Sequence, residues 1–160
     1  GGKVLAMAGR ARAQFFAHDV APRRMKDLPD RAERAGVRVE ILEPDDLGQA
    51  APFDLVLCDA PCSGSGAWRR SPEGKWALTP DGLADLNSIQ DEILDTAEAL
   101  VAEGGTLAYS TCSVLAAEND DRIAAFVLRH PEWQVDWAHH WLPGAEGDGF
   151  FAACLTRVSK

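Results

Sequence analysis

The chain has 160 residues, of which 46% are hydrophobic, and carries a formal charge of −9 at pH 7. This size predicts one globular domain with its own core. The sequence has no apolar run of about eighteen residues and no basic-then-apolar start, which argues against a membrane span and a signal sequence. Its four cysteines have no zinc-site spacing, so we expect reduced thiols, no metal and a cytoplasmic protein.

The first third of the chain predicts short alternating elements. They are a short helix at 4–8 that follows a Gly-Gly-Lys turn, a strand at 14–20, a helix at 22–35 and a strand at 37–42. Pro29 should kink the second helix or delay its start, and Gly36 is typical of a helix end.

Acidic residues follow both of these strands. Asp19 ends the first strand, where a carboxylate commonly accepts hydrogen bonds from ribose hydroxyls. The alternative is that Asp19 caps the helix that opens at Pro22. Asp45 and Asp46 follow the second strand. They could contribute to a ligand site or, equally, be two solvated turn carboxylates.

The segment at 53–66, FDLVLCDAPCSGSG, joins an apolar strand to a carboxylate, a proline and a thiol. Ligands of open α/β sheets collect beyond the carboxyl ends of such strands, which would place Asp59 and Cys62 in the crevice. The residues at 63–66 then predict a flexible loop that lets a substrate approach the backbone.

A second thiol has nearly the same setting at 106–113, TLAYSTCS, where a strand ends on Thr111 and Cys112. A lone cysteine at a strand end is usually a small buried hydrophobic residue. Two of them, one behind Asp-Ala-Pro and one behind Ser-Thr, favour chemistry instead. We therefore expect the two strand ends to face each other.

The stretch at 68–76 is both basic and aromatic, which suits a single RNA strand that needs charge and stacking surfaces. It could equally be a surface loop with buried tryptophans. Over the whole chain the basic residues are few for an RNA-binding protein, because phosphate contacts usually come from Lys and Arg. They form small clusters that include Arg10, Arg12, Arg23, Arg24, Arg69, Arg70 and Lys75.

The second half predicts two helices and a hairpin. Thr79 caps a long helix that opens at Pro80, and Gly104 and Gly105 should end it. Its apolar stripe is Leu83, Leu86, Ile89, Ile93, Ala97 and Leu100. A second helix is expected at 118–130, and strands at 133–137 and 150–155 should form a hairpin. The four histidines, at 18, 130, 139 and 140, show no metal-like arrangement.

The alternation of strands and helices predicts an α/β fold with a parallel, doubly wound sheet. The motifs DAPCSGSG and YSTCS resemble the two cysteine motifs of the NOL1/NOP2/Sun family of RNA cytosine-C5 methyltransferases. The segments GGK, HDVAPRRM, RRSPEGKW and GDGFFAACL are also similar to family segments. The likeness is strongest to the bacterial members that act on 16S ribosomal RNA, and it covers essentially the whole chain.

The resemblance implies a Rossmann-like class I S-adenosylmethionine-dependent methyltransferase sheet with an antiparallel C-terminal hairpin. The family's first strand and its Asp-x-Cys-Ala-Ala-Pro motif do not precede Gly1, so we expect one catalytic domain at 1–160 that lacks this strand. The missing strand would lie between those ending at Asp19 and Asp59. Their exposed edges predict either a dimer that fills the gap or a partly disordered amino-terminal third, and poor cofactor binding by the chain alone.

The resemblance also assigns roles to individual residues. Cys112 would add to carbon 6 of cytosine, Cys62 would help to remove the C5 proton or release the enzyme, and Asp59 would hold the N3 and N4 edge. Cys112 needs a favourable environment, because a free thiol has a pKa of about 8.5. The cofactor would contact Gly1, Gly2, Lys3, Asp19, Arg24, Asp45, Asp59 and Pro61. The RNA would contact Arg69, Arg70 and Lys75.

Other classes of function remain open at this point. One is a catalytically inactive RNA-binding or assembly module of the same fold, and another is cytosine methylation of tRNA. A third is a cysteine hydrolase or redox enzyme that uses Cys112, which would need a histidine within reach of the thiol.

Overall fold

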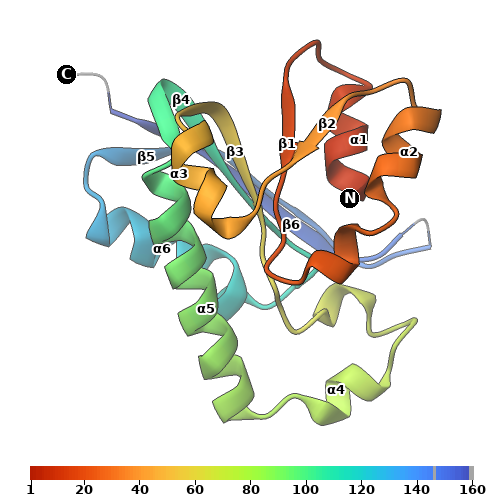
Figure 1. The fold of residues 1–160 in the computed structure, drawn as a ribbon. Helices are drawn as coiled ribbons and strands as arrows, with labels where there is room; N and C mark the ends of the chain where they lie inside the picture. Colours follow the sequence, from red (N-terminus) through yellow and green to blue (C-terminus); the bar gives the residue numbers. More distant parts are fainter. Residues whose placement is uncertain (146, 159–160) are drawn as a thin grey trace. The chain divides into compact units, whose positions relative to one another are not determined.

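The computed structural model describes residues 1–145 and 147–158 (Figure 1). These residues belong to two compact units, Gly1–Ala50 and Ala51–Lys160, which are described one at a time. The elements of the first unit are α1 (Gly2–Ala8), β1 (Phe15–Ala17), η1 (Pro22–Met25), α2 (Leu28–Arg34), β2 (Val39–Ile41), η2 (Pro44–Asp46) and α3 (Leu47–Ala50). Those of the second are β3 (Phe53–Asp59), η3 (Ser65–Ala67), α4 (Glu73–Ala77), α5 (Pro80–Glu98), β4 (Val101–Thr111), η4 (Ala116–Glu118), α6 (Asp120–Arg129), β5 (Trp133–Trp141) and β6 (Phe150–Arg157).

The first unit is built on a parallel pair of strands, β1 and β2, whose register places Ala17 opposite Ile41. Its small core consists of Val4 from α1, Met25 from η1 and Leu28 from α2. Both predicted strands are present but shorter than expected. The helix expected at 22–35 is divided, since α2 begins only at Leu28 and carries Pro29 in its first turn, where the missing N–H costs no hydrogen bond.

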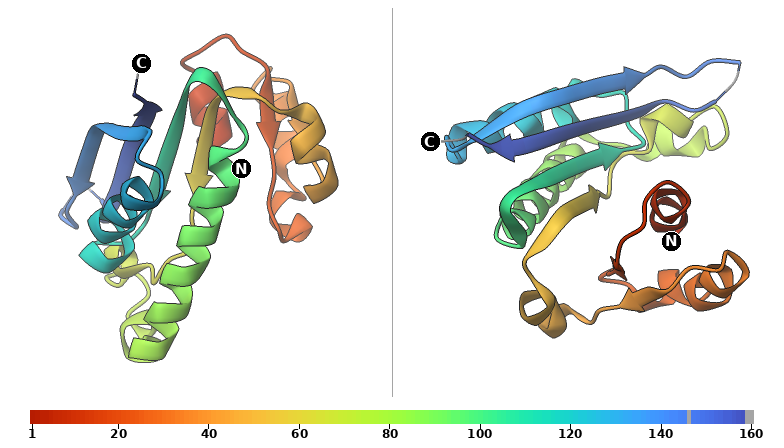
Figure 2. Two further views of the ribbon diagram at one scale, coloured as in Figure 1. Left: turned by 90° about the vertical axis from the view of Figure 1, so that its left-hand side faces the viewer. Right: turned by 90° about the horizontal axis from the view of Figure 1, so that it is seen from above.

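The second unit contains a four-stranded sheet in the order β3-β4-β6-β5 (Figure 2). The β3–β4 pair is parallel, whereas β6 pairs antiparallel with both β4 and β5. Figure 2 shows α5 and α6 along the same face of this sheet, and side chains from both helices share the core with the strands. That core consists of Cys58, Ala60, Leu94, Ala97, Val101, Leu107, Tyr109, Ile123, Phe126, Trp133, Phe151, Ala153 and Leu155. The α/β class with an antiparallel C-terminal hairpin is thereby confirmed.

Helix α5 begins as the sequence predicted. The Gly82 amide donates to Thr79 Oγ1 over 3.1 Å, and Pro80 occupies the first turn. Its buried positions are Gln90, Leu94 and Ala97. Ala97 belongs to the predicted stripe, whereas Gln90 and Leu94 each lie one residue after a predicted position. Ile89 was wrongly placed in that stripe, because its side chain is 43% exposed.

The prediction that Gly104 and Gly105 end α5 is wrong. The helix ends at Glu98, and both glycines lie inside β4. There the pairing with β3 shifts, so that Phe53 lies opposite Val101 but Leu55 lies opposite Thr106. This irregularity requires glycine, since Gly104 has φ +71° and a Cβ on Gly105 would lie 3.0 Å from the Asp54 carbonyl oxygen.

Among the described residues, β1 pairs only with β2 and β3 pairs only with β4. The expected central strand, the single catalytic domain and the dimer stay predictions. Within 1–145 and 147–158, no helix is long and apolar enough to cross a membrane.

Candidate active site

The parallel pairing of β3 and β4 places the two cysteine motifs at the same end of the sheet. Asp59 is the last residue of β3 and lies opposite Ser110 of β4. The Ala60 amide donates to the Ser110 carbonyl over 3.0 Å, which extends the ladder by one bond beyond β3. The chain then leaves the sheet on both strands, through Cys62 on one and Cys112 on the other.

The two thiols are in contact. The Cys62 and Cys112 sulfur atoms lie 3.3 Å apart, and both residues are half-buried rather than sealed in the core. The Gly66 amide donates to the Cys112 carbonyl over 3.0 Å, so the loop after Cys62 folds back onto the second motif. The expected approach of the two strand ends is therefore observed.

The contact has an electrostatic consequence for Cys62. Its hydrogen bond with Cys112, followed by burial, raises the pKa of the Cys62 thiol well above its usual range. This keeps the proton on Cys62, where it can be shared with the Cys112 sulfur. The other cysteines differ, because burial alone raises the pKa of Cys58 to about 12 and burial is also the main cause of the raised pKa of Cys154.

Buried polar residues behind the thiols connect the two motifs, and the sequence analysis missed them. Glu118, Asn119 and Gln90 are 0% exposed, and hydrogen bonds join them to residues of both cysteine loops. Glu118 was assigned to a helix, but α6 begins only at Asp120. One signal was available, since Gln90 is a polar residue at the core spacing of an amphipathic helix.

A close backbone contact supports the loop beside the thiols. The Gly149 amide donates to the Gly66 carbonyl over 2.9 Å. A Cβ added to Gly66 would lie 2.1 Å from the Gly149 carbonyl oxygen, and a Cβ on Gly149 would lie 2.5 Å from Val114 Cγ1. Only glycine permits this approach at either position.

The predicted RNA contacts lie on the surface next to this loop, and two of them have protein partners. Arg69 donates to the Gly144 carbonyl over 2.6 Å, and Arg70 pairs with Asp148. That pairing raises the pKa of Arg70 and lowers the pKa of Asp148. Both arginines stay exposed, so their role in RNA binding stays a prediction.

Lys75 belongs to α4, within the stretch at 68–76 for which a surface loop was the alternative prediction. Its ammonium lies 5.4 Å from the ring centre of Trp76, and Trp76 is 81% exposed. This exposure argues against a buried Trp76, whereas Trp68 is half-buried and donates to the Ser63 carbonyl over 3.4 Å. An exposed ring beside a cation suits base stacking.

The predicted cofactor residues of the first unit lie at the ends of its elements. Asp19 and Asp45 follow two adjacent parallel strands, and Asp45 lies in η2. The Ala21 amide donates to Asp19 Oδ1 over 2.8 Å, and Arg24 Nη1 lies 3.9 Å from the same oxygen. Asp19 therefore fixes the turn before η1, but the N-cap is Ala21 and makes no side-chain cap.

The N-terminal helix begins earlier than expected, because α1 already contains Gly2 and Lys3, which were predicted to form a turn. Gly1 is the N-cap of α1, and a Cβ there would lie 3.0 Å from Leu28 Cδ1. Pro61, predicted beside Asp59, is exposed, and its carbonyl accepts a hydrogen bond from Gln90 Nε2 over 2.9 Å. Two acidic side chains beyond adjacent parallel strands and a glycine at the N-cap of a helix fit the ribose and adenine of a nucleoside cofactor.

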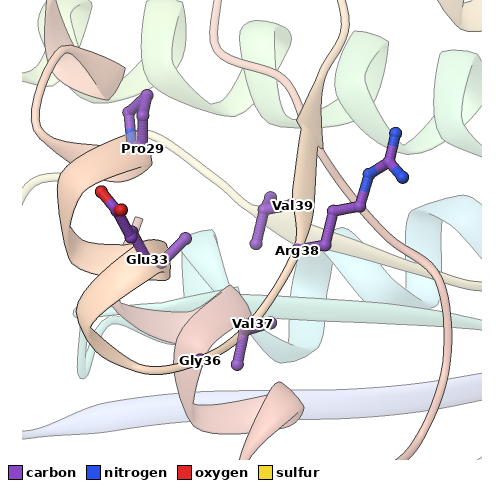
Figure 3. Close-up of a pocket in the computed structure, with 7 residues that line it drawn as sticks. Pro29, Glu33, Gly36, Val37, Arg38 and Val39 are labelled. Atoms are coloured by element: carbon purple, nitrogen blue, oxygen red, sulfur yellow. The ribbon is translucent and has the colours of Figure 1, made fainter.

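Two other features were tested as alternative sites. Figure 3 shows a shallow depression in the first unit that contains none of the predicted site residues; it is lined by Pro29, Ala32, Glu33, Gly36, Val37, Arg38 and Val39. In the second unit, Glu98, His130 and Glu132 bring ligand-type atoms within 4.8 Å, so one histidine does lie in a metal-like cluster, against expectation. Arg157 donates to Glu98 Oε1 over 2.8 Å, which makes this cluster an ion-pair network.

Residues 1–156 match the family model described as 16S rRNA methyltransferase RsmB/F. The chain belongs to this family. Relatives include "Ribosomal RNA small subunit methyltransferase B" of Klebsiella pneumoniae, which is 37% identical, and that of Citrobacter koseri, which is 39% identical. Each alignment covers 91% of this chain, and the chain spans only 37% of the length of these curated relatives.

Solved structures show the same fold. The crystal structure of PH0851 has a TM-score of 0.80 at 33% identity and covers 91% of this chain and 37% of that one. The structure of NSun6 from Pyrococcus horikoshii with SFG has a TM-score of 0.77 at 21% identity, covering 93% of this chain and 42% of that one. The Rossmann-like methyltransferase fold expected from the sequence is thereby confirmed.

Proposed function

We propose that this chain catalyses S-adenosylmethionine-dependent methylation of carbon 5 of cytosine in RNA, with 16S ribosomal RNA as the substrate. The observation that carries the proposal is the 3.3 Å contact between Cys62 and Cys112 at the ends of adjacent parallel strands. Family membership and the names of the relatives support RNA methylation. The choice of cytosine carbon 5 depends on the two thiols.

The reaction needs a nucleophile because carbon 5 of cytosine is itself unreactive. Addition of the Cys112 thiolate to carbon 6 moves an electron pair toward carbon 5, which can then attack a methyl group. The raised pKa of Cys62 supports this assignment, since Cys62 keeps its proton and can donate it toward a Cys112 thiolate. The target base must leave its stack to reach a thiol at a strand end.

Adduct formation would change the protonation state of Cys62. Once the Cys112 sulfur is bonded to carbon 6 it is a neutral thioether, so the main cause of the raised pKa of Cys62 disappears. Cys62 can then release its proton to solvent and accept the proton that carbon 5 must lose. The Cys112–C6 bond breaks as its electron pair returns to sulfur, which regenerates the thiolate.

The remaining predicted residues would bind the cofactor and the base. S-adenosylmethionine, when bound, supplies an electrophilic methyl group. Asp19 and Arg24 would hold its ribose, Asp45 its adenine, and residues 1–3 its methionine end. Asp59 is exposed at the end of β3, where its carboxylate can accept a hydrogen bond from the N4 amino group of the base.

The environment of the histidines disfavours a cysteine hydrolase. His18 contacts the Leu42 carbonyl, His130 contacts Asp95 and His140 contacts Asp120. His139 stacks on Trp137 at 6.1 Å. Each ring therefore has a partner other than Cys62 or Cys112, whereas a hydrolase needs an imidazole as the base for its nucleophile.

The test uses three variants of the full-length protein with 16S rRNA and tRNA. Cys112→Ala should abolish 5-methylcytosine, measured by mass spectrometry of digested RNA. Cys62→Ala should accumulate an RNA adduct that survives a denaturing gel, because addition occurs while release is blocked. Cys154→Ala, which removes a half-buried thiol in β6, is the matched control and should behave as wild type.

Each contrary outcome has a defined meaning. Methylation by Cys112→Ala would refute the covalent mechanism, and an adduct formed only by that variant would mean that the thiols exchange roles. A wild-type protein that binds RNA without methylating it would support the inactive module. Product in tRNA alone would correct the substrate.

A further inference from the structure

Two fully buried polar residues lie behind both thiols: Glu118, the last residue of η4, and Asn119, the N-cap of α6. Each is 0% exposed. The Tyr109 hydroxyl donates to the Glu118 carbonyl over 2.8 Å, which fixes the backbone of the pair to β4. A carboxylate in such a place is costly unless donors satisfy it. The identity of its donors therefore indicates what it does.

The Glu118 carboxylate joins the two cysteine loops directly. Glu118 Oε1 accepts from the Ser63 amide over 2.7 Å, and Glu118 Oε2 accepts from both the Ser63 and the Ser113 hydroxyls. Ser63 follows Cys62 in the chain, and Ser113 follows Cys112. One side chain therefore holds the residue after each thiol.

The residue before Cys62 is held through a third side chain. Gln90 of α5 donates from Nε2 to Glu118 Oε1 over 3.2 Å and to the Pro61 carbonyl over 2.9 Å. Glu118 thus acts on both sides of Cys62, directly at Ser63 and through Gln90 at Pro61.

Asn119 does the same for Cys112. The Thr111 hydroxyl donates to Asn119 Oδ1 over 2.6 Å, and Asn119 Nδ2 donates to the Ser113 carbonyl over 3.0 Å. The residues immediately before and after Cys112 are both tied to this one amide. Every chain neighbour of either thiol is therefore held by the Glu118–Asn119 pair or by Gln90.

We propose that Glu118, together with Asn119, is a positioning residue that sets the separation of the Cys62 and Cys112 sulfur atoms. Its importance for catalysis rests on the function proposed above, because the proton exchange between the thiols needs them in contact. The geometric claim does not depend on methylation and is tested first without RNA.

The first test measures thiol pairing with phenylarsine oxide in the full-length protein. The trivalent arsenic forms bonds to two adjacent sulfurs and releases one water, with no change of oxidation state. The wild type should bind one equivalent, and Cys62→Ala should bind none through two sulfur atoms. Glu118→Ala should bind at least tenfold more weakly, and Glu118→Gln should fall between it and the wild type, since an amide keeps the shape and loses the charge.

The matched control is Glu98→Gln. Glu98 also accepts hydrogen bonds within the second unit, from Arg157 and Trp133, but it touches neither cysteine loop. It should bind phenylarsine oxide as the wild type does. If Glu118→Ala does not fold, judged by circular dichroism, Ser63→Ala and Ser113→Ala each remove one donor and should each weaken binding.

Four results would overturn the proposal. They are a wild type that binds no phenylarsine oxide, a folded Glu118→Ala that binds it as the wild type does, unchanged binding in both serine variants, and equal weakening by Glu98→Gln.

The second test connects positioning to the reaction. Glu118→Gln should lower kcat for RNA methylation by about tenfold or more while KM for RNA changes little, because the RNA contacts lie elsewhere. A purely structural residue would lower the amount of active protein without changing kcat per folded site. Weakened arsenical binding in Glu118→Ala, together with retained methylation by Cys112→Ala, would leave the positioning claim intact and refute the covalent mechanism proposed above.

Discussion

Substitution of Gly66 by alanine should disturb the thiol pair through the backbone alone. The new Cβ would lie 2.1 Å from the Gly149 carbonyl oxygen and 2.8 Å from the Gly149 Cα. Ordinary non-bonded carbon contacts are about 3.5 Å, so one backbone must move by roughly 1 Å. That movement pulls on two hydrogen bonds, from the Gly66 amide to the Cys112 carbonyl and from the Gly149 amide to the Gly66 carbonyl.

The expected loss of stability follows from these contacts. Overpacking of a close contact costs about 1 to 3 kcal/mol, and each weakened hydrogen bond costs up to about 1 kcal/mol. We therefore expect Gly66→Ala to lower the free energy of unfolding by about 1 to 5 kcal/mol. Because the Cys112 carbonyl is one of the acceptors, arsenical binding by the two thiols should weaken as well.

The assay is urea unfolding followed by circular dichroism, with Gly144→Ala as the matched control. Gly144 lies in the same segment as Gly149, but a Cβ there meets nothing within 4 Å. This control should stay within about 0.5 kcal/mol of the wild type. If Gly66→Ala were as stable as Gly144→Ala and bound phenylarsine oxide normally, the close approach would not exist in solution.

Two further predictions concern titration and the cofactor. Burial raises the pKa of Cys58 from 9.0 to about 12. The unfolded chain therefore loses this proton at lower pH than the folded chain, and stability falls as pH rises above 9. From pH 9 to 11, the free energy of unfolding of the wild type, measured by urea titration, should fall by about 2 kcal/mol more than that of Cys58→Ala. Parallel pH profiles would contradict this. Asp19→Ala should weaken S-adenosylmethionine binding by about 1 to 3 kcal/mol in calorimetry of the full-length protein, whereas Asp30→Ala on the exposed surface of α2 should not. Unchanged affinity would leave Asp19 as the acceptor of the turn before η1.

The sequence predicted the strands and the meeting of the thiols because both depend on local patterns. Apolar runs end on Asp59 and Thr111, and parallel strands bring their carboxyl ends to one edge of a sheet. The errors arose where tertiary contacts override local signals. Glycines such as Gly104 and Gly105 usually end helices, but here they permit an irregular strand pairing that cannot be predicted from the sequence.

The residues that hold the thiols could not be predicted for a related reason. Ser63 and Glu118 are 55 positions apart, and Gln90 and Pro61 are 29 apart, so their hydrogen bonds exist only after α5 and η4 have packed against the sheet. A motif reports which atoms can react, whereas the network decides whether they are in contact. If the positioning proposal is correct, a related chain that keeps both cysteines but replaces Glu118 and Asn119 should pair its thiols poorly. The cysteine motifs alone would then not separate an active enzyme from an inactive module of the same fold.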